Sequence, residues 1–205
     1  MSEAERNEAK MIASVLRGES ELYHDLIRPY ERSVFRMALS FMKNEADAEE
    51  VVQEAFLKAF RKLSEFRAEA KFSTWLISIT LNEARSRLRR KSAVPMQSLD
   101  APEDEGGHVS PALLRDWREI PGEALERQEV RHMLRRAIEG LSPIYREVVM
   151  LRDVEELSIE QTASTLEITS SAVKVRLHRA RLMLQKVLAP QLKHINPKRR
   201  WLPWS

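Results

Sequence analysis

The stretch SIEQTASTLEITSSAVKVRLHRARLML, from Ser158 to Leu184, decides the fold of the second half of this chain. Apolar residues at helical spacing predict a short helix over Ser158–Leu166 and a longer one over Ser170–Val187. Only Glu167–Thr169 separates them, which is the length of a tight turn. Two helices joined in this way predict a helix-turn-helix, a motif that lays its second helix in the major groove of DNA.

The longer helix has two different faces. Ala163 of the first helix supplies the small residue needed where the helices cross, and the stripe expected to be buried is Val173, Leu177, Ala180 and Leu184. The opposite, polar face and its flanks carry Ser170, Ser171, Lys174, Val175, Arg176, His178, Arg179 and Arg181. Such a face offers hydrogen-bonding groups to base edges and guanidinium groups to phosphates. A basic amphipathic helix in an ordinary helical hairpin has the same local pattern and is the alternative.

Helical spacing recurs almost everywhere outside the middle of the chain. We therefore predict an all-α protein with two small helical domains joined by a flexible linker. The middle is marked by helix-breaking residues, namely Pro95, Pro102, Gly106, Gly107, Pro111, Pro121 and Gly122. The expected order is an N-terminal helical domain over 1–92, a polar linker over 93–125, a helix-turn-helix domain over 126–190 and a basic, tryptophan-containing tail over 191–205.

Helix starts are marked by capping residues. Asn44, followed by Asp47, precedes one apolar run, and Ser142 precedes a first-turn proline. Ser158 and Gln161 have the spacing of a capping box. We expect a helix to begin at each of these three places.

The segment Phe72–Lys91 starts apolar on all sides and ends strongly basic. The stripe expected to be buried is Ile77, Leu81, Ala84 and Leu88. A second face and the preceding loop carry Phe66, Arg67, Lys71, Trp75, Asn82, Arg85 and Arg89. Aromatic rings that stack on bases, together with cations that follow the backbone, suit single-stranded or opened nucleic acid. The alternative is that Trp75 and Phe66 are core residues and the arginines form a solvated helix end.

An acidic helix is predicted over Asp47–Leu63. We expect it to bury Val52, Phe56, Ala59 and Leu63. Its far face carries Glu50, Gln53, Glu54 and Arg61, with Leu57 as the one apolar residue among them. A single exposed leucine usually has no special role, but carboxylates around it can make it the anchor for a basic protein partner. The residues alone leave both possibilities open.

The composition limits the class of protein. Lys and Arg outnumber Asp and Glu by only 34 to 31, so the net charge gives no clear sign of nucleic-acid binding. The absence of cysteine excludes disulfides and thiolate metal sites and fits a reducing cytoplasm. No apolar run approaches membrane-span length, and the charged N-terminus MSEAERNEAK lacks the apolar core of a signal peptide. We expect a cytoplasmic protein without a cofactor or membrane insertion.

Taken together, these segments resemble the small two-domain bacterial sigma factors of the extracytoplasmic-function (ECF) group, from about Gly18 to Leu188. DAEEVVQEAFLKAF (Asp47–Phe60) is similar to that family's helix for binding core polymerase. FSTWLISITLNEARSRLRR (Phe72–Arg90) is similar to its promoter-melting helix, and VKVRLHRARLML (Val173–Leu184) to its recognition helix. Three matches in the family's order are far more specific than any single one.

The resemblance implies a factor that binds RNA polymerase core and directs promoter-specific initiation, with no catalytic chemistry of its own. It implies that the clamp helices of the largest polymerase subunit contact Asp47, Glu50, Gln53, Glu54 and Leu57. It assigns the −10 element and its opening to Phe66, Arg67, Lys71, Trp75, Asn82, Arg85 and Arg89. It assigns the −35 element to Ser170, Ser171, Lys174, Arg176, His178 and Arg179. An anti-sigma partner is also implied.

Two features depart from the family pattern. Glu167 stands where the turn usually has glycine, and a non-glycine residue at positive φ costs about 1–2 kcal/mol unless the turn is reshaped. The tail after Leu188, APQLKHINPKRRWLPWS, corresponds to no part of the family. Its basic residues and tryptophans could bind DNA or a partner, and a disordered tail is the alternative.

Two other classes of protein compete with this interpretation. An ordinary helix-turn-helix repressor or activator would leave the acidic helix and the Trp75 face unexplained, and such proteins usually dimerise. A di-metal helical-bundle enzyme is suggested by two Glu-x-x-His steps, Glu21 to His24 and Glu129 to His132. That enzyme would need two further inward-facing glutamates, and no phosphate-binding loop or nucleophile motif supports a catalytic role.

Overall fold

Helices form all the regular structure in the described part of the chain. The computed structural model describes residues 3–91 and 128–195, which belong to two compact units, Met1–Ser98 and Leu99–Ser205. The prediction of an all-α protein with two helical parts is confirmed. The predicted linker, 93–125, lies outside the described residues, and so do residues 196–205 of the predicted tail.

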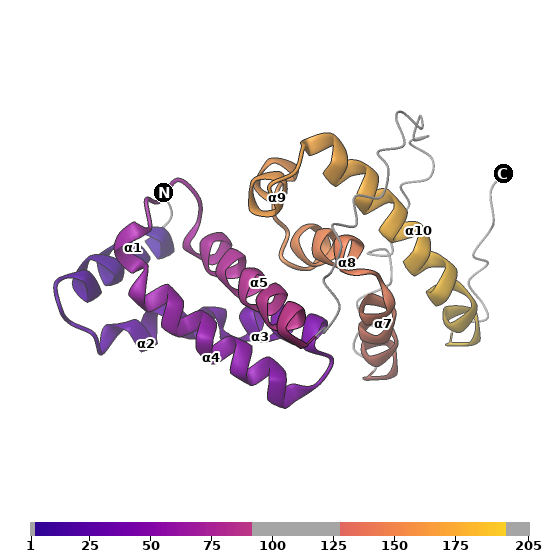
Figure 1. The fold of residues 1–205 in the computed structure, drawn as a ribbon, viewed down its shortest axis with the longest axis horizontal. Coiled ribbons are helices and arrows are strands. Elements are labelled where there is room, and N and C mark those ends of the chain that lie inside the picture. The colour runs from indigo at the N-terminus through magenta and orange to yellow at the C-terminus, as the bar shows by residue number, and fades with distance from the viewer. Residues whose placement is uncertain (1–2, 92–127, 196–205) are drawn as a thin grey trace. The chain divides into compact units, whose positions relative to one another are not determined.

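Three mutually packed helices form the core of the first unit, and Figure 1 shows where they lie. Its elements in the described range are α1 (Glu3–Leu16), α2 (Leu22–Ile27), η1 (Arg28–Tyr30), α3 (Glu31–Met42), α4 (Glu45–Arg61), η2 (Leu63–Glu65) and α5 (Phe72–Lys91). The core lies where α3, α4 and α5 pack against one another. The Tyr30 hydroxyl donates a hydrogen bond to Glu8, which joins α1 to η1. The helix predicted over Phe72–Lys91 is confirmed with these bounds.

Helix α4 buries a narrow face of mostly small residues, namely Ala48, Val51, Ala55 and Ala59. Val52 and Phe56 are only half-buried, so the prediction that they belong to the core was wrong. Small side chains let α4 approach its neighbours closely, and the larger residues are then displaced to the flanks. Leu63 is buried as predicted, but it lies in η2, beyond the end of α4.

Ion pairs join α4 to α5 near both ends of α4. Toward its C-terminal end, Lys58 pairs with the buried Glu83 of α5. At its start, Asp47 pairs with Arg87 and Lys91 near the end of α5. Because the start of one helix meets the end of the other, the two helices run antiparallel. Both end regions of α4 are therefore joined electrostatically to the C-terminal half of α5.

The second unit contains the helix-turn-helix. Its elements in the described range are α7 (Gln128–Gly140), α8 (Pro143–Val149), the π-helical turn η5 (Met150–Val154), α9 (Ile159–Leu166) and α10 (Ser170–Ile195). Helix α10 packs against α7, α8 and α9. The buried Arg146 donates hydrogen bonds to the backbone oxygens of Ile138, Glu139 and Leu141 at 3.1, 2.6 and 2.6 Å. These bonds hold the carbonyls at and just after the end of α7, of which that of Ile138 also accepts from the Leu141 N–H at 3.1 Å.

The structure confirms the two predicted helices of the helix-turn-helix and the predicted buried stripe on the second of them. Val173, Leu177, Ala180 and Leu184 are all buried, as is Ala163 at the crossing. Glu167 closes α9 in the left-handed conformation, with φ 57° and ψ 41°. The Ile168 N–H donates to the Ala163 oxygen at 3.0 Å, which completes the turn. The turn therefore keeps the glycine-type geometry although glycine is absent.

A buried ion pair fixes α10 to the turn before α9. Arg181 donates from Nε and Nη2 to the two carboxylate oxygens of Asp153, at 3.1 and 2.6 Å. The Asp153 side chain is fully buried and that of Arg181 is 19% exposed. The expectation that Arg181 flanks the DNA-facing side for phosphate contact is wrong, because its guanidinium is engaged inside the unit. A paired arginine satisfies a buried carboxylate that would otherwise be very costly.

Two of the three predicted caps are confirmed. The Asn44 side chain accepts a hydrogen bond from the Asp47 N–H at 2.8 Å. Ser158 and Gln161 form the reciprocal bonds of a capping box, at 3.1 and 2.8 Å. Ser142 does precede α8, but its side chain makes no capping hydrogen bond. Helix α8 still begins where predicted, with Pro143 at the first helical position, and the Tyr145 N–H donates to the Ser142 backbone oxygen at 3.1 Å.

Helix α10 is longer than predicted. It continues past Val187 to Ile195 and contains Pro190. Proline removes one helical hydrogen bond, to the carbonyl of the residue four positions earlier, which is Lys186. Lys186 is exposed, so water can replace the missing donor and the helix does not have to end there.

We expect Glu167→Gly to raise the free energy of unfolding of the second unit by about 1 kcal/mol. Glycine avoids the clash that left-handed backbone imposes on other residues, although it also adds entropy to the unfolded chain. Urea denaturation followed by circular dichroism measures the change. Ser164→Gly, inside α9, is the control and should lower stability by about 1 kcal/mol. Equal or lower stability in Glu167→Gly would contradict the assignment of strain to this turn.

Candidate functional site

The DNA-facing side predicted for α10 is accessible. Ser171 and Lys174 are exposed, and the others are half-buried, namely Ser170, Val175, Arg176, His178 and Arg179. Thr169 fixes the start of this helix, because its Oγ1 accepts a hydrogen bond from the Ala172 N–H at 3.1 Å. Apart from Arg181, the structure brings the predicted duplex-reading residues together at the first part of α10. Polar side chains on a helix held this firmly can be laid against base edges.

A carboxylate beside this face was missed by the sequence analysis. This carboxylate is Glu160, at the start of α9. The pKa of Glu160 is lowered mainly because its own backbone N–H donates a hydrogen bond to its side chain. The Ser158 hydroxyl, which donates to Glu160 Oε2 at 2.8 Å, lowers it further, and the charges of Lys174 and Arg152 act in the same direction. Lys174 therefore has an anionic neighbour in Glu160. The capping box at Ser158 was the signal that a carboxylate two residues later lies at this helix start.

Phe66 and Trp75 form a half-buried aromatic surface over the fully buried Phe72. The ring centroids are 5.3 Å apart for Phe66 and Trp75, 5.5 Å for Phe66 and Phe72, and 5.6 Å for Phe72 and Trp75. The sequence left open whether these two rings are core residues or ligand-binding residues. Their inner edges pack and the remainder is accessible, which is the arrangement that lets a ring both pack and stack on a base.

The polar side chains expected beside this aromatic surface are accessible as well. Asn82 and Arg89 of α5 are exposed and Arg85 is half-buried, while Arg67 and Lys71 are exposed in the loop that precedes the helix. On the core side, Ile77, Leu81 and Ala84 are buried as predicted. Leu88 is only half-buried, because the last turns of α5 lie at the edge of the core, so this part of the prediction was wrong.

The outer face of α4 carries two large apolar side chains. Leu57 is 50% exposed and Phe60 is 42% exposed, so the prediction that Leu57 is the one apolar residue there was wrong. Phe60 meets the ring of Tyr23 edge-on at 4.9 Å, and the Tyr23 hydroxyl donates to the Phe56 oxygen at 2.7 Å. Around them, Glu50, Gln53 and Arg61 are exposed and Glu54 is half-buried. An apolar centre with a charged surround is typical of a protein interface.

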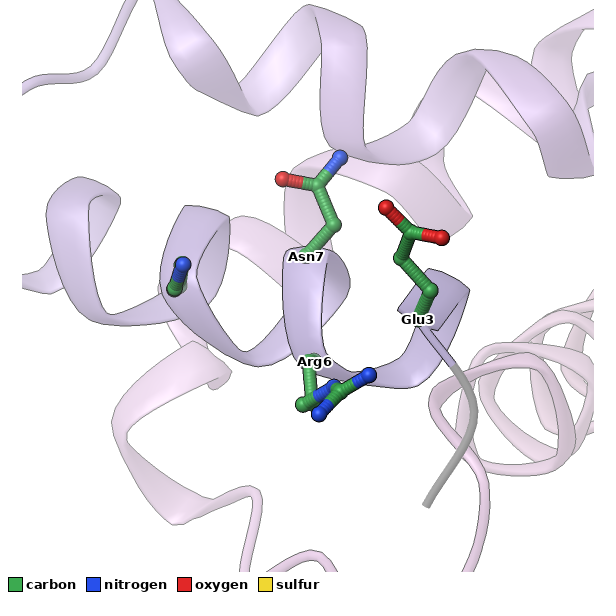
Figure 2. Close-up of a pocket in the computed structure, with 4 residues that line it drawn as sticks. Glu3, Arg6 and Asn7 are labelled. Carbon is green, nitrogen blue, oxygen red and sulfur yellow. The ribbon is translucent and has the colours of Figure 1, made fainter.

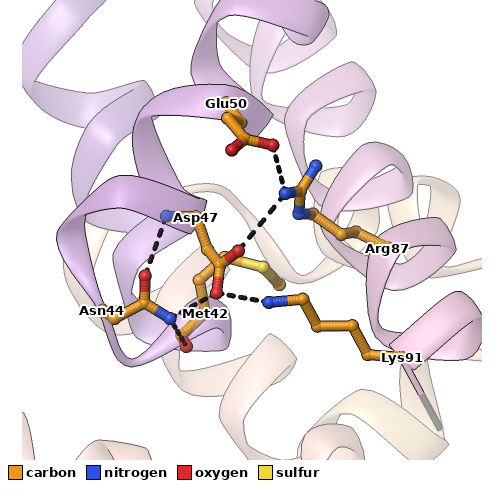
Figure 3. Close-up of polar contacts among 6 residues, drawn as sticks. All are labelled: Met42, Asn44, Asp47, Glu50, Arg87 and Lys91. Carbon is orange, nitrogen blue, oxygen red and sulfur yellow. Dashed lines mark hydrogen bonds and ion pairs between the residues drawn. The ribbon is translucent and has the colours of Figure 1, made fainter.

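An ion cluster formed by Asp47, Glu50, Arg87 and Lys91 joins this face of α4 to the end of α5 (Figure 3). Arg87 Nη2 donates to Asp47 Oδ1 at 3.2 Å and also to Glu50, and Lys91 donates to Asp47. The Asn44 side chain adds a donor to Asp47. Asp47 is 17% exposed, so its carboxylate is directed at α5 more than at the outer face.

The cluster stabilises the charged form of Asp47. Lys91 above all, and then Asn44 and Arg87, lower the pKa of Asp47 from its usual 3.8 to about 2. A carboxyl group with a depressed pKa stabilises the fold most when it is charged in both the folded and unfolded states. This contribution is therefore present above pH 3.8 and is lost as the pH falls toward 2.

Features typical of an enzyme do not gather in the residues that the structure describes. Glu21 and His24 are both exposed, and no three His, Cys, Asp or Glu side chains within ranges 3–91 and 128–195 could share a metal ion. One hollow is lined from α1 alone, by Glu3, Arg6, Asn7 and Lys10 (Figure 2). Its polar groups belong to a single helix and converge on no common point. In the same ranges, no helix has both the length and the apolar character that crossing a bilayer requires.

The fold and these surfaces define a helix-turn-helix DNA-binding protein with a second helical unit suited to opened nucleic acid and to a protein partner. Residues 26–94 match the Sigma-70 region 2 family, and residues 131–184 match the Sigma-70, region 4 family. The two matches fall in the first and second unit, respectively.

Similar proteins align with nearly the whole chain. The RNA polymerase sigma-H factor of Pseudomonas aeruginosa is 31% identical over 193 residues, which span 92% of this chain and 97% of that protein. The ECF RNA polymerase sigma-E factor of Escherichia coli is 30% identical over 186 residues, with 89% and 95% covered. The ECF RNA polymerase sigma factor SigW of Bacillus subtilis is 29% identical, with 87% and 95% covered.

Solved structures show the same fold. CnrH, solved in complex with the cytosolic domain of CnrY, matches with a TM-score of 0.60 and 23% identity over 89% of this chain and 97% of that one. The sigma factor RpoE in complex with the anti-sigma factor NepR from Bartonella quintana matches with a TM-score of 0.58 and 24% identity, over 80% and 94%.

The chain belongs to the ECF group of RNA polymerase sigma factors. It binds RNA polymerase core and directs promoter-specific transcription initiation by reading −10 and −35 elements and aiding promoter opening. It is an initiation factor and not an enzyme.

We expect Lys91→Met to raise the pKa of Asp47 from about 2 toward 3.8, because Lys91 contributes most to the lowering. The pKa is measured from the pH titration of the Asp47 carboxyl carbon by NMR. Arg90→Met removes the same charge one residue earlier, outside the cluster, and should leave the titration midpoint unchanged. A midpoint that moves equally in both variants would indicate a general charge effect instead of the contact.

Proposed function

We propose that three helices divide the work of this sigma factor. Helix α10 reads the −35 element, α5 with the preceding loop reads and opens the −10 element, and the outer face of α4 binds the clamp helices of the largest polymerase subunit. Residues 1–92 are then the domain for polymerase and the −10 element, and residues 126–190 the domain for the −35 element. The observation that carries the proposal is that most residues of each set are accessible on a helix whose other side is buried in the core, or on the loop that precedes it.

The −35 assignment rests on the first turns of α10. Lys174 and His178 offer donors to base edges from the middle of the accessible face, and Arg176 and Arg179 lie beside them for base or phosphate contact. Ser170 and Ser171 lie at the N-terminal end of the helix, where backbone N–H groups favour phosphate oxygens. The buried stripe leaves this face of the helix to DNA.

The −10 assignment rests on aromatic groups near the start of α5 and on basic groups in the preceding loop and toward the end of α5. The half-buried rings of Phe66 and Trp75 can take a base by stacking, and Asn82 can hydrogen-bond to its edge. The cations on the loop and the helix follow the backbone, namely Arg67, Lys71, Arg85 and Arg89. This combination favours an opened strand over an intact duplex, because stacked bases in a duplex cannot reach a protein ring.

The polymerase assignment rests on Leu57 and the acidic groups around it. Glu50, Gln53 and Glu54 surround an apolar centre that Phe60 enlarges, which fits a partner helix with apolar and basic side chains. Asp47 belongs to the same set in the resemblance, and it supports the face from within through the ion cluster. We add Phe60 to the proposed contact because it lies one turn from Leu57 and is similarly exposed.

A protein inhibitor in the cytoplasm completes the proposal. The Bartonella sigma factor with the same fold was solved with the anti-sigma factor NepR bound to it. An inhibitor that covers the outer face of α4 or the accessible face of α10 would block polymerase or promoter binding directly. Since polymerase and promoters are cytoplasmic in bacteria, the chain acts in the cytoplasm.

We expect Leu57→Arg to weaken binding to core polymerase at least tenfold, because a hot-spot leucine is replaced by a charge in the apolar centre. The measurement is co-elution with sigma-free bacterial core in gel filtration, followed by run-off transcription from a promoter library. Leu16→Arg is the matched control, since Leu16 of α1 is 51% exposed and lies outside the proposed contact.

The two variants separate the possible results. Loss of co-elution and of transcription in Leu57→Arg alone would support the α4 contact. Equal loss in both variants, or no loss in either, would remove α4 from the polymerase interface. A chain that shifts duplex DNA without ever directing transcription would point to an ordinary helix-turn-helix regulator.

We expect Lys174→Ala to lower the preference for the favoured base at one position of the −35 element by about tenfold, because a donor to a base edge is lost. The measurement is the set of promoters that the holoenzyme selects from a library randomised in the −35 region. Lys186→Ala removes the same charge further along α10 and should leave the selected sequence unchanged. An unaltered selection in Lys174→Ala would exclude Lys174 from base reading.

A further inference from the structure

The carboxylate of Glu160 is held in one place although the residue is exposed. Glu160 lies two residues after Ser158, which caps the start of α9. The Ser158 hydroxyl donates to Glu160 Oε2 at 2.8 Å, and the backbone N–H of Glu160 donates to the same carboxylate. An exposed glutamate ordinarily samples many rotamers. Two donors from its own turn of helix therefore fix where this negative charge lies.

The capping box commits the proton of Ser158 to Glu160. Ser158 Oγ accepts a hydrogen bond from the Gln161 N–H at 3.1 Å, and Gln161 Oε1 accepts one from the Ser158 N–H at 2.8 Å. A hydroxyl has a single proton to donate, and here Glu160 accepts it. The cap that starts α9 therefore also orients the Glu160 carboxylate.

The oriented carboxylate lies within electrostatic reach of Lys174 on α10. Helices α9 and α10 pack against each other, with Ala163 and Val173 buried. Glu160 lies one turn before Ala163, and Lys174 directly follows Val173. Lys174 favours the charged form of Glu160 through its own charge and not through a hydrogen bond. The exposed Lys174 ammonium is thus attracted by Glu160 while its donors stay available to DNA.

A lysine without such a neighbour does not distinguish a base edge from a phosphate. Its ammonium is a point charge on a flexible stem, and the phosphates carry the negative charge of the duplex. A fixed carboxylate changes this balance, because it attracts the ammonium and repels a phosphate that approaches the same place. A base edge has no net charge and is not repelled in this way. Specificity then increases because the wrong contact is weakened.

We propose that Glu160 is a positioning residue for Lys174, which keeps the ammonium directed at a base edge of the −35 element and away from the DNA backbone. The inference rests on the proposed function, in which Lys174 contacts a base. Glu160 itself needs no contact with DNA in this role. It strengthens the preference for one base and weakens binding to DNA of random sequence.

The test compares two substitutions that remove the same charge near opposite ends of α9. Glu160→Gln keeps the size of the side chain and still offers an oxygen to the Ser158 hydroxyl. Glu167→Gln removes the charge of another exposed glutamate, about 10 Å further along the helix. Each full-length variant is combined with bacterial core polymerase, and the holoenzyme selects promoters from a library randomised in the −35 region.

Glu160→Gln should lower the base preference about two- to fivefold at the position that Lys174→Ala affects, the range expected when one accessible charge interaction is lost. Glu167→Gln should leave that preference unchanged. A purely structural role of Glu160 would lower the preferences at all −35 positions together. That result, or an equal effect of the two substitutions, would overturn the inference.

Competition by DNA of random sequence gives a second readout. The quantity measured is the concentration of random-sequence duplex that halves run-off transcription from the selected promoter. It should be about two- to fivefold lower for Glu160→Gln than for Glu167→Gln, because phosphates then compete better for Lys174. Equal concentrations for the two variants would contradict the repulsion of phosphates on which the proposal depends.

A Lys174→Ala background separates the possible failures. Without Lys174, Glu160→Gln should change neither readout more than Glu167→Gln does, because no ammonium is left to position. An effect of Glu160 that persists in this background would overturn the positioning role. If Lys174→Ala alone leaves the selected sequence unaltered, the proposed base contact itself fails, and the positioning role fails with it. Circular dichroism checks that each variant is folded.

Discussion

The close approach of α4 to α5 is the constraint on which the first unit depends. The buried face of α4, which packs against α3 and α5, consists largely of Ala48, Ala55 and Ala59, whose small side chains do not hold the helices apart. The short separation brings Lys58 to Glu83 near one end and Asp47 to Arg87 and Lys91 at the other.

The same constraint determines what the two helices present outward. With the alanine face turned inward, Leu57 and Phe60 of α4 are left accessible, and so are the cations at the end of α5. A larger residue at any of the three alanines would separate the helices and weaken the ion pairs. The outer face of α4 and the accessible face of α5 would then lose their fixed relation.

Much of this architecture could be predicted from the sequence. The helix Phe72–Lys91, the capping box at Ser158 and the buried stripe of α10 follow from local periodicity and capping, which are properties of neighbouring residues. The burial of Phe56 and the solitary exposure of Leu57 were wrong because they depend on which neighbours α4 meets. Periodicity identifies an apolar face, but it does not say whether alanines or phenylalanines on adjacent faces lie innermost. The pairings of Asp47 and Arg181 depend on distant residues and have no local signal.

The Asp153–Arg181 pair changes how the second unit should respond to salt. A protein that binds DNA displaces about one condensed cation from the duplex for each phosphate it neutralises, and this release makes affinity fall with ionic strength. Arg181 is committed to an internal carboxylate and is not available to displace such a cation. A count of the basic residues of α10 therefore overestimates the number of its phosphate contacts. The affinity of α10 for DNA should fall less steeply with salt concentration than that count suggests.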